Sequence, residues 1–415
     1  MELSDTAGPG IHIDAANVRA LTRSLPLMMK ATIRFAARLH YGTLKITIPS
    51  GEMFVIHGKS PGPNAGFIIH DEAFPARIFS KGDIGVAEGY IDEQWSSPDV
   101  ATVIELFCVN QGLISDALEN HNWFNRIMRM RGWLTRNTRR GSKKNISAHY
   151  DLGNAFYSQW LDPSMTYSSA LFETGNEGLG EAQTQKYRHL AVETDIHEND
   201  QVLEIGCGWG GFAEFAAKEI GCNVTALTIS NEQFEFAQKR IFDAGLTEKV
   251  KIKFQDYRDE QGVYDRIASI EMFEAVGEQY WSEFFDRMKI CLRPGGTAGL
   301  QIITIQDRFF ASYRSEMDFI QRYIFPGGML PSPQILKDLG DRVDMKLVSE
   351  RIFGQDYATT LRLWHNRFLE AWPSIKPLGF DRKFKNLWEY YMFYCEAGFR
   401  SGNIDVRQLV YSRPE

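Results

Sequence analysis

The chain has 415 residues, a formal net charge of −7 and 44% apolar residues. Its length favours two or three domains, and its acidic balance argues against general nucleic-acid binding. The five cysteines are scattered without C-x-x-C spacing, so neither a metal site nor a disulfide framework is expected. No run of about 18 apolar residues would cross a bilayer, and the acidic N-terminus is unlike a signal peptide, so we expect a cytoplasmic protein.

The N-terminal part of the chain predicts a small α+β domain over residues 1–120. Apolar and polar residues alternate on both sides of a Pro-Ser-Gly turn within residues 40–58, which is typical of a β-hairpin. Residues 65–71 read as a further strand, and helical spacing follows Pro98.

A basic segment, residues 121–145, follows this region. It has eight arginines and lysines, no acidic residue, and apolar residues at roughly helical spacing. The pattern fits a solvated linker helix whose apolar stripe packs on a neighbouring domain. It fits equally a basic amphipathic helix on an anionic membrane surface.

From about residue 195 the chain alternates between strand and helix patterns. Strands separated by helices of this length indicate right-handed crossovers and a mostly parallel sheet. The expected strands lie in the stretches QVLEI (201–205), NVTALTIS (223–230), KVKIKFQD (249–256), YDRIASIEMF (264–273) and GGTAGLQIITI (295–305).

A cluster of glycines joins the first of these strands to a helix. The turn GCGWGG places glycines at 206, 208, 210 and 211, and glycine lets the backbone approach a ligand closely. The spacing differs from the dinucleotide fingerprint G-x-G-x-x-G, and the second strand ends in Thr228, Ile229 and Ser230 without the acid that would hold a ribose.

The arrangement E-x-G-C-G-x-G resembles the first motif of S-adenosylmethionine-dependent methyltransferases. Further motifs, in one collinear series over about residues 145–412, resemble the cyclopropane-fatty-acyl-phospholipid synthases, relatives of the mycolic acid cyclopropane synthases. They are HYDLGNAFYSQWLDPSMTYSSALF (149–172), QDYRD (255–259), MFEAVG (272–277), YIFPGGMLPS (323–332) and FGQDYATTLRLW (353–364). The resemblance implies an α/β fold, a class I methyltransferase Rossmann-like sheet over residues 146–415 beside the smaller N-terminal α+β domain.

The resemblance also implies the reaction. The methyl group of S-adenosylmethionine is transferred to the cis double bond of an acyl chain in a membrane phospholipid, and loss of a proton closes a cyclopropane ring. The residues that match the family's donor-binding positions are Tyr167, Ser168, Glu204, Gly206, Gly208, Thr228, Ser230, Gln233, Asp256 and Tyr257.

In the family the base is a bound bicarbonate, held by a cysteine, a glutamate, a histidine and a tyrosine, with an isoleucine two residues after the histidine. Glu274, Tyr357 and Ile303 match this set, whereas Ser169 replaces the cysteine and Gln301 replaces the histidine. Serine and glutamine still hydrogen-bond an anion, but the imidazolium charge is lost. Methylation without ring closure, giving a methyl or methylene fatty acid, is therefore the alternative, and Glu271 is the less favoured candidate carboxylate.

A phospholipid substrate requires contact with the membrane, so the resemblance favours the membrane interpretation of residues 121–145 and a peripheral location at the inner face. The family often forms pairs of subunits, which implies a homodimer. Two rivals are a soluble C- or N-methyltransferase for small molecules and a lipid-binding module without catalysis.

Overall fold

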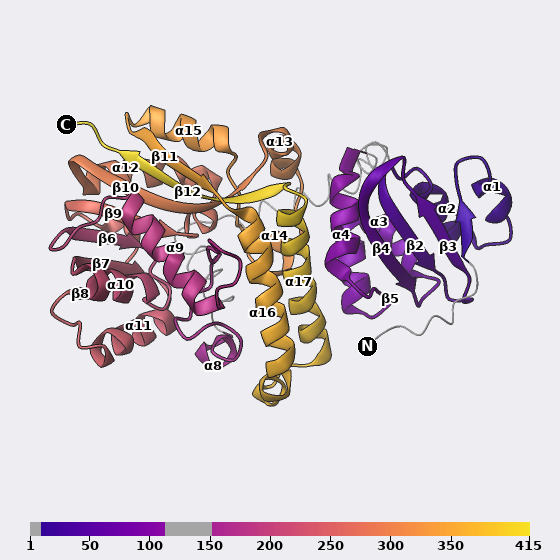
Figure 1. Ribbon diagram of the computed structural model, residues 1–415, viewed down its shortest axis with the longest axis horizontal. Helices are drawn as coiled ribbons and strands as arrows, with labels where there is room; N and C mark the ends of the chain where they lie inside the picture. The colour runs from indigo at the N-terminus through magenta and orange to yellow at the C-terminus, as the bar shows by residue number, and fades with distance from the viewer. Residues whose placement is uncertain (1–9, 113–151) are drawn as a thin grey trace. The chain divides into compact units, whose positions relative to one another are not determined.

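The computed structural model of the protein describes residues 10–112 and 152–415, which belong to two compact units (Figure 1). The first unit combines the N-terminal residues with 380–401, and the second contains residues 131–379 and 402–415. The basic segment 121–145, for which we predicted an amphipathic helix, lies outside the described residues.

The first unit is a five-stranded sheet with helices, in the strand order β1-β3-β2-β4-β5. The predicted hairpin is confirmed, because β2 and β3 pair antiparallel with Thr43 opposite His57 and Thr47 opposite Met53. Gly51 takes the left-handed conformation in the turn, with φ of 90°. The elements of this unit are β1 (Ile11–Ile13), α1 (Val18–Leu21), α2 (Leu27–Ala36), β2 (Tyr41–Thr47), β3 (Met53–His57), β4 (Ser60–Ile69), α3 (Phe74–Ile91), β5 (Trp95–Ser96), α4 (Val100–Val109) and α17 (Arg382–Arg400).

The long helix α17 packs within the first unit, although it lies in the range 146–415 that we assigned to the catalytic domain. The ring of Tyr390 lies 5.6 Å from that of Tyr90 on α3. Arg400 forms an ion pair of 2.5 Å with Glu105 on α4. The aromatic stretch 390–399 therefore contributes to the core of the smaller unit.

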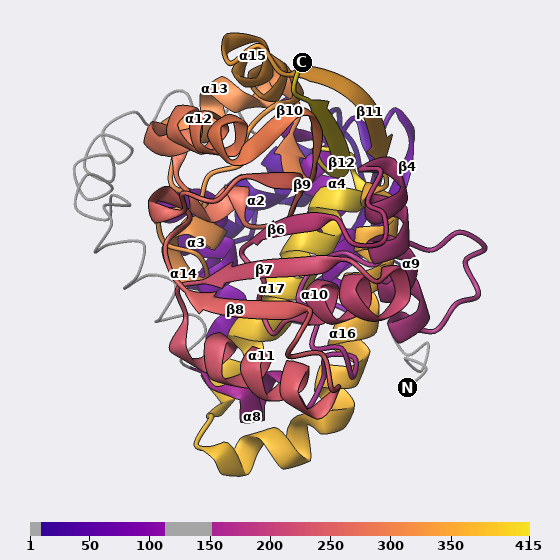
Figure 2. The same cartoon turned by 90° about the vertical axis from the view of Figure 1, so that its left-hand side faces the viewer.

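The second unit contains a seven-stranded sheet in the order β11-β12-β10-β9-β6-β7-β8. Five consecutive strands of this sheet are parallel to one another: β10, β9, β6, β7 and β8. Strand β12 is antiparallel to both of its neighbours, β10 and β11. Figure 2 shows β9, β6, β7 and β8 side by side. The strands are β6 (Gln201–Ile205), β7 (Asn223–Thr228), β8 (Val250–Phe254), β9 (Tyr264–Ile270), β10 (Leu292–Ile305), β11 (Lys346–Ile352) and β12 (Ile404–Ser412).

Helices cover both faces of this sheet, and each face has its own core. Consecutive residues of β6 belong to different cores: Val202 packs with Phe212 of α10, and Leu203 packs with Phe284 of α12. Strand residues alternate between the two faces, so an apolar run such as QVLEI fits a strand buried on both sides. The predicted class I methyltransferase fold, with its parallel core flanked by helices, is confirmed.

The α-helices of the second unit are α8 (Asn154–Tyr157), α9 (Leu179–Glu193), α10 (Gly211–Phe215), α11 (Asn231–Asp243), α12 (Trp281–Cys291), α13 (Asp307–Ser315), α14 (Phe319–Tyr323), α15 (Pro333–Arg342) and α16 (Gly354–Ile375). Shorter helical segments are the π-helix η3 (Ala216–Ile220) and the 3₁₀ turns η4 (Tyr257–Asp259), η5 (Phe273–Ala275), η6 (Glu278–Tyr280) and η7 (Lys376–Leu378). Among residues 10–112 and 152–415, no helix is both long and apolar enough to cross a membrane.

Candidate active site

The turn after β6 has a backbone shape that glycine adopts most readily. Gly206, Gly208 and Gly210 have φ angles of 83°, 52° and 82°, in the left-handed region where a side chain is strained. The amides of Gly206 and Cys207 donate to the carbonyl of Leu227 on β7, at 3.1 and 2.8 Å. A Cβ on Gly208 would meet nothing within 4 Å, so the turn leaves space in which a ligand can approach the backbone.

A close contact joins this turn to the end of β9. A Cβ on Gly206 would lie 2.5 Å from Cγ of Met272, the residue that follows Glu271 and precedes the turn containing Glu274. The glycines and these two carboxylates are therefore neighbours at the carboxyl ends of β6 and β9. Open parallel sheets bind their ligands at this edge.

Glu204, the fourth residue of β6, adds a third carboxylate to this edge of the sheet. The residue is 2% exposed, and its Oε2 has no hydrogen-bond partner in the part of the chain that the structure describes. Burial raises the pKa of Glu204 to about 8, while the backbone amide of Ala213 and the charge of Lys186 act in the opposite direction. A buried carboxyl oxygen without a partner is costly, so a polar or cationic ligand that reached it would be stabilised.

At the end of β7, three of the predicted donor-binding residues hydrogen-bond to one another. The hydroxyl of Thr228 donates to Oε1 of Gln233 at 3.0 Å and accepts from the amide of Ser230 at 3.2 Å. Ser230 caps α11, because its Oγ accepts from the amide of Gln233 at 3.4 Å. All three residues are buried. They lie at the end of β7, which pairs with β6, the strand that leads into the glycine turn.

Asp256 and Tyr257 follow β8 and differ in how they are held. Arg258 donates to both oxygens of Asp256, from Nε at 2.9 Å and from Nη2 at 2.5 Å. The hydroxyl of Tyr257 is buried without a hydrogen-bond partner among the described residues, and burial raises its pKa. Sequence reasoning missed Arg258. The available signal was a cation two residues after the candidate carboxylate Asp256.

Tyr167 and Ser168 lie on the segment between α8 and α9. The hydroxyl of Ser168 accepts from Nζ of Lys186 at 2.5 Å, and its carbonyl accepts from Nε2 of Gln183 at 2.8 Å. Lys186 is fully buried, and burial lowers its pKa to about 7, against the opposing charges of Glu271, Asp162 and Glu204. Sequence reasoning missed this lysine, which occupies the buried stripe of α9 in line with Ala182 and Leu190.

Aromatic rings surround Tyr167. Its ring centroid lies 5.4 Å from that of Tyr157 and 5.3 Å from that of Trp364, and Trp364 lies 6.1 Å from Tyr357. Aromatic faces attract cations through their quadrupole. This cluster therefore suits a cationic ligand or a cationic reaction intermediate.

Three of the residues predicted to hold an anion converge on one side chain, Glu271. Its Oε1 accepts from the amide of Ser169 at 2.8 Å and from Nε2 of Gln301 at 2.7 Å. Its Oε2 accepts from the hydroxyl of Tyr357 at 2.6 Å. Burial raises the pKa of Glu271, and the charge of Lys186 together with these three donors opposes that rise.

Gln301 is itself oriented by further amide contacts. Its Oε1 accepts from Nε2 of Gln408 on β12 at 3.0 Å, and Oε1 of Gln408 is 2.6 Å from Nδ1 of His189. This arrangement fixes which end of the Gln301 amide faces Glu271. The donor on Gln301 is therefore positioned by residues that the sequence analysis did not select.

Glu274, the carboxylate that the resemblance favoured, has a different environment. Its Oε1 accepts from the backbone amide of Ile303 at 2.5 Å, whereas its Oε2 is buried and has no partner in the described chain. Burial, followed by the charge of Glu271, raises the pKa of Glu274 to about 8. The predicted set of Glu274, Tyr357, Gln301, Ser169 and Ile303 is thus divided between two carboxylates.

We predict that Glu274→Gln changes how stability depends on pH. The pKa of Glu274 is about 8 in the folded chain against an ordinary value of 4.5, so the folded state holds the proton more tightly and the wild type loses stability as pH rises through that window. The variant lacks this loss, and its advantage grows between pH 4.5 and 8 by an amount on the order of a few kcal/mol. Denaturant unfolding of both proteins across pH measures it.

Glu235→Gln, on the exposed face of α11, is the matched control, since it removes an exposed carboxylate. Its unfolding curve should follow that of the wild type at every pH. Parallel pH profiles for Glu274→Gln and the wild type would contradict the account of a buried, protonated Glu274.

The residues present fit S-adenosylmethionine, which carries a sulfonium methyl group, a ribose and an adenine. The open space over Gly208 and the unpartnered polar atoms of Glu204 and Tyr257 are what such a ligand requires. The predicted donor-binding residues that the structure gathers at the carboxyl ends of β6, β7 and β8 are Glu204, Gly206, Gly208, Thr228, Ser230, Gln233, Asp256 and Tyr257.

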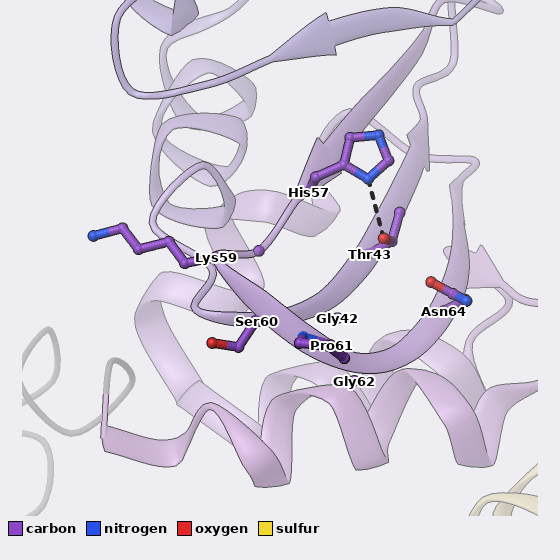
Figure 3. A pocket seen from close by; sticks show the side chains of 9 residues that line it. Gly42, Thr43, His57, Lys59, Ser60, Pro61, Gly62 and Asn64 are labelled. Atoms are coloured by element: carbon purple, nitrogen blue, oxygen red, sulfur yellow. Dashed lines mark hydrogen bonds between the residues drawn. The ribbon is translucent and has the colours of Figure 1, made fainter.

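A separate hollow lies in the first unit, between β2 and the start of β4, and Figure 3 shows it from close by. Oγ1 of Thr43 and Nδ1 of His57 are 3.1 Å apart at its edge. None of the predicted site residues lines this hollow. Its lining consists of Gly42, Thr43, His57, Gly58, Lys59, Ser60, Pro61, Gly62 and Asn64.

The fold and the glycine turn with its buried carboxylates define an S-adenosylmethionine-dependent methyltransferase. The family model for mycolic acid cyclopropane synthetase matches residues 137–409, and the chain belongs to this family.

Similar proteins agree. The chain is 36% identical over 357 residues to the tuberculostearic acid methyltransferase UfaA1 of Mycobacterium tuberculosis, with 84% of this chain and 83% of that protein covered. It is 34% identical over 367 residues to the cyclopropane-fatty-acyl-phospholipid synthase of Escherichia coli K12, with 86% and 90% covered. Among solved structures, the cyclopropane synthase MmaA2 of M. tuberculosis matches with a TM-score of 0.62 and 28% identity, over 65% of this chain and 98% of that one.

Proposed function

We propose that the enzyme transfers the methyl group of S-adenosylmethionine to the cis double bond of an unsaturated acyl chain in a membrane phospholipid, and that proton loss then gives a cyclopropane fatty acid. The similar proteins support, at a coarser level, methylation or cyclopropanation of lipid acyl chains.

One observation carries the proposal: the glycine turn, which we propose holds the donor, adjoins carboxylates that are buried or partly buried. Gly206 lies against Met272, and the residues on either side of this contact include Glu204, which is buried, and Glu271, which is partly buried. An alkene is a weak nucleophile, and the cation that methylation leaves on it is destroyed by water. A dry site with a nearby proton acceptor meets both demands.

The chain's own residues divide this work. The glycine turn and Glu204 would hold the donor, which supplies an electrophilic methyl group. The rings of Tyr167 and Trp364, 5.3 Å apart, would stabilise positive charge by their faces. The hydrogen-bonded residues around Glu271 keep a carboxylate ready to accept a proton.

Methylation that ends in a methylene chain is the second candidate product. The 36% identical relative is named a methyltransferase rather than a cyclopropane synthase. If a hydride first shifts from the methylated carbon to the neighbouring cationic carbon, loss of a proton from the added methyl group leaves an exocyclic double bond instead of a ring. The two products have equal masses. Proton NMR of the extracted lipid separates them, because ring protons and vinylidene protons resonate in different regions.

The proposed substrate lies in a membrane, so the enzyme would meet it at the membrane surface. We propose that the basic segment 121–145 binds anionic lipid at the inner face, since each cation near such a surface contributes about 1 kcal/mol. A homodimer stays a proposal as well.

The test is turnover with a methyl-labelled donor. Anionic vesicles of a phospholipid with cis-unsaturated chains should become labelled in the acyl chains, and matched vesicles with saturated chains should not. Labelling of a small amine without labelling of the unsaturated lipid would contradict the proposal and favour a soluble small-molecule methyltransferase.

A further inference from the structure

The hydrogen bonds around Glu271 form a binding site for one carboxylate. Two donors reach Oε1, from Ser169 and Gln301, and one reaches Oε2, from Tyr357. A planar anion that accepts on both oxygens is what such a set recognises. In this chain the anion is the side chain of Glu271 itself.

The backbone at Glu271 is shaped to place this side chain. Its φ of 48° is left-handed, an uncommon conformation for a residue other than glycine. The amide of Glu271 donates to the carbonyl of Gln301 at 2.8 Å, which anchors the residue to β10 at the end of β9. Strained backbone of this kind concentrates at functional sites.

A bound bicarbonate, which the resemblance implied, does not fit these residues as arranged. The amide of Ser169, the amide nitrogen of Gln301 and the hydroxyl of Tyr357 already donate to Glu271 at 2.6–2.8 Å. An additional anion would have to displace this carboxylate and would lie against its charge. The ion and the side chain are therefore alternatives for one place.

We propose that Glu271 is the catalytic base of this enzyme and takes the place of an external bicarbonate. This inference rests on the proposed function. After methyl addition to the lipid double bond, a lone pair of the Glu271 carboxylate takes one proton from the added methyl carbon. The electron pair of that C–H bond forms the third side of the ring, which cancels the positive charge on the chain. The neutral acid then releases its proton to solvent before the next turnover, and no oxidant or reductant is consumed.

Glu271 suits this role better than Glu274. Lys186 and three hydrogen-bond donors favour its ionised form, while Glu274 is supported by backbone amides alone and is disfavoured as an anion by Glu271 itself. A base must be ionised before it accepts a proton. Of the two carboxylates at the end of β9, Glu271 is the one equipped to be so.

Two variants test the inference on the full chain, assayed with unsaturated phospholipid vesicles in buffer stripped of bicarbonate. The wild type should keep its full rate. Glu271→Gln keeps the size of the side chain and should lower kcat at least 100-fold, with unchanged binding of S-adenosylhomocysteine by calorimetry. Glu271→Gly suits the left-handed φ and vacates the carboxylate's place, so it should be inactive alone and regain at least tenfold in rate when bicarbonate is added.

Glu271→Gln should show no such rescue, because its side chain still fills the place. The inference is overturned if the wild type needs bicarbonate, if Glu271→Gln turns over like the wild type, or if folded Glu271→Gly is not rescued. No turnover by the wild type on unsaturated phospholipid would instead contradict the proposed function. A wild type that needs bicarbonate would overturn the inference even if a variant fails to fold.

Discussion

Gly206→Ala is expected to weaken binding of S-adenosylmethionine by about 100-fold, because the added methyl group overpacks the turn that we propose holds the donor. The new Cβ would lie 2.5 Å from Cγ and 2.8 Å from Cβ of Met272, too close for either to stay in place. Either the glycine turn or Met272 must move to remove this collision. Movement of the turn disturbs the proposed donor site, and movement of Met272 disturbs its neighbour Glu271. Isothermal titration with the donor measures the loss.

The matched control is Gly245→Ala. Gly245 also has a left-handed φ, of 69°, but a Cβ there would meet nothing within 4 Å. It carries the conformational cost of about 1–2 kcal/mol without the collision, so stability should fall while donor binding persists. Equal donor affinity of Gly206→Ala and the wild type would show that the donor does not lie on this turn.

Lys186→Met is expected to move the acidic limb of the pH–rate profile to higher pH. The charge of Lys186 lowers the pKa of Glu271 against the effect of burial, so its removal lets that pKa rise further, and the base is ionised only at higher pH. Each unit of upward shift costs tenfold in ionised base on the acidic side, and we expect at least a tenfold loss below pH 7. The effect should shrink above pH 7, because the pKa of Lys186 itself is lowered to about 7.

Lys239→Met provides the control for this variant. Lys239 pairs with Asp243 on the exposed face of α11 at 2.6 Å, and such pairs contribute little. Its pH–rate profile should overlay that of the wild type. An unchanged acidic limb in Lys186→Met would remove the lysine from the account of how Glu271 is tuned.

The sequence predicted the framework of the second unit closely. The stretch QVLEI is β6 to the residue, and β10 begins three residues before the predicted stretch 295–305 and ends with it. Long apolar runs between glycine turns permit little else, because a strand buried on both faces has a distinctive composition. The donor-binding candidates lie at the carboxyl ends of neighbouring strands, and the topology of a parallel sheet brings these ends to one edge.

The identity of the central carboxylate could not be predicted in this way. Glu271 and Glu274 are three residues apart, and their spacing does not say which one receives the donors of Gln301 and Tyr357. Glu271 has a left-handed φ and its amide donates to the carbonyl of Gln301 on β10, features that local sequence spacing does not predict. The effect of Lys186 on Glu271 could not be predicted for a similar reason, because only the folded chain brings α9 to the end of β9.

Helix α17 shows the limit for domain organisation. Its sequence lies far from the N-terminal residues, yet Tyr390 packs on Tyr90 and Lys383 pairs with Asp92 at 2.8 Å. Local periodicity indicates an amphipathic helix without naming the surface that covers its apolar side. The range 146–415 for the catalytic domain therefore stays a prediction that takes no account of this packing.

The most direct measurement is the number of deuterium atoms that the lipid keeps from a donor carrying a CD₃ group. Unsaturated phospholipid vesicles are incubated with the wild type and this donor, and the masses of the acyl chains are measured by mass spectrometry. If the methyl group is added and then loses a proton to the buried base, each modified chain keeps two of the three deuterium atoms. Chains that keep all three would show that the added methyl is never deprotonated, and a base beside the donor would then have no part in the reaction.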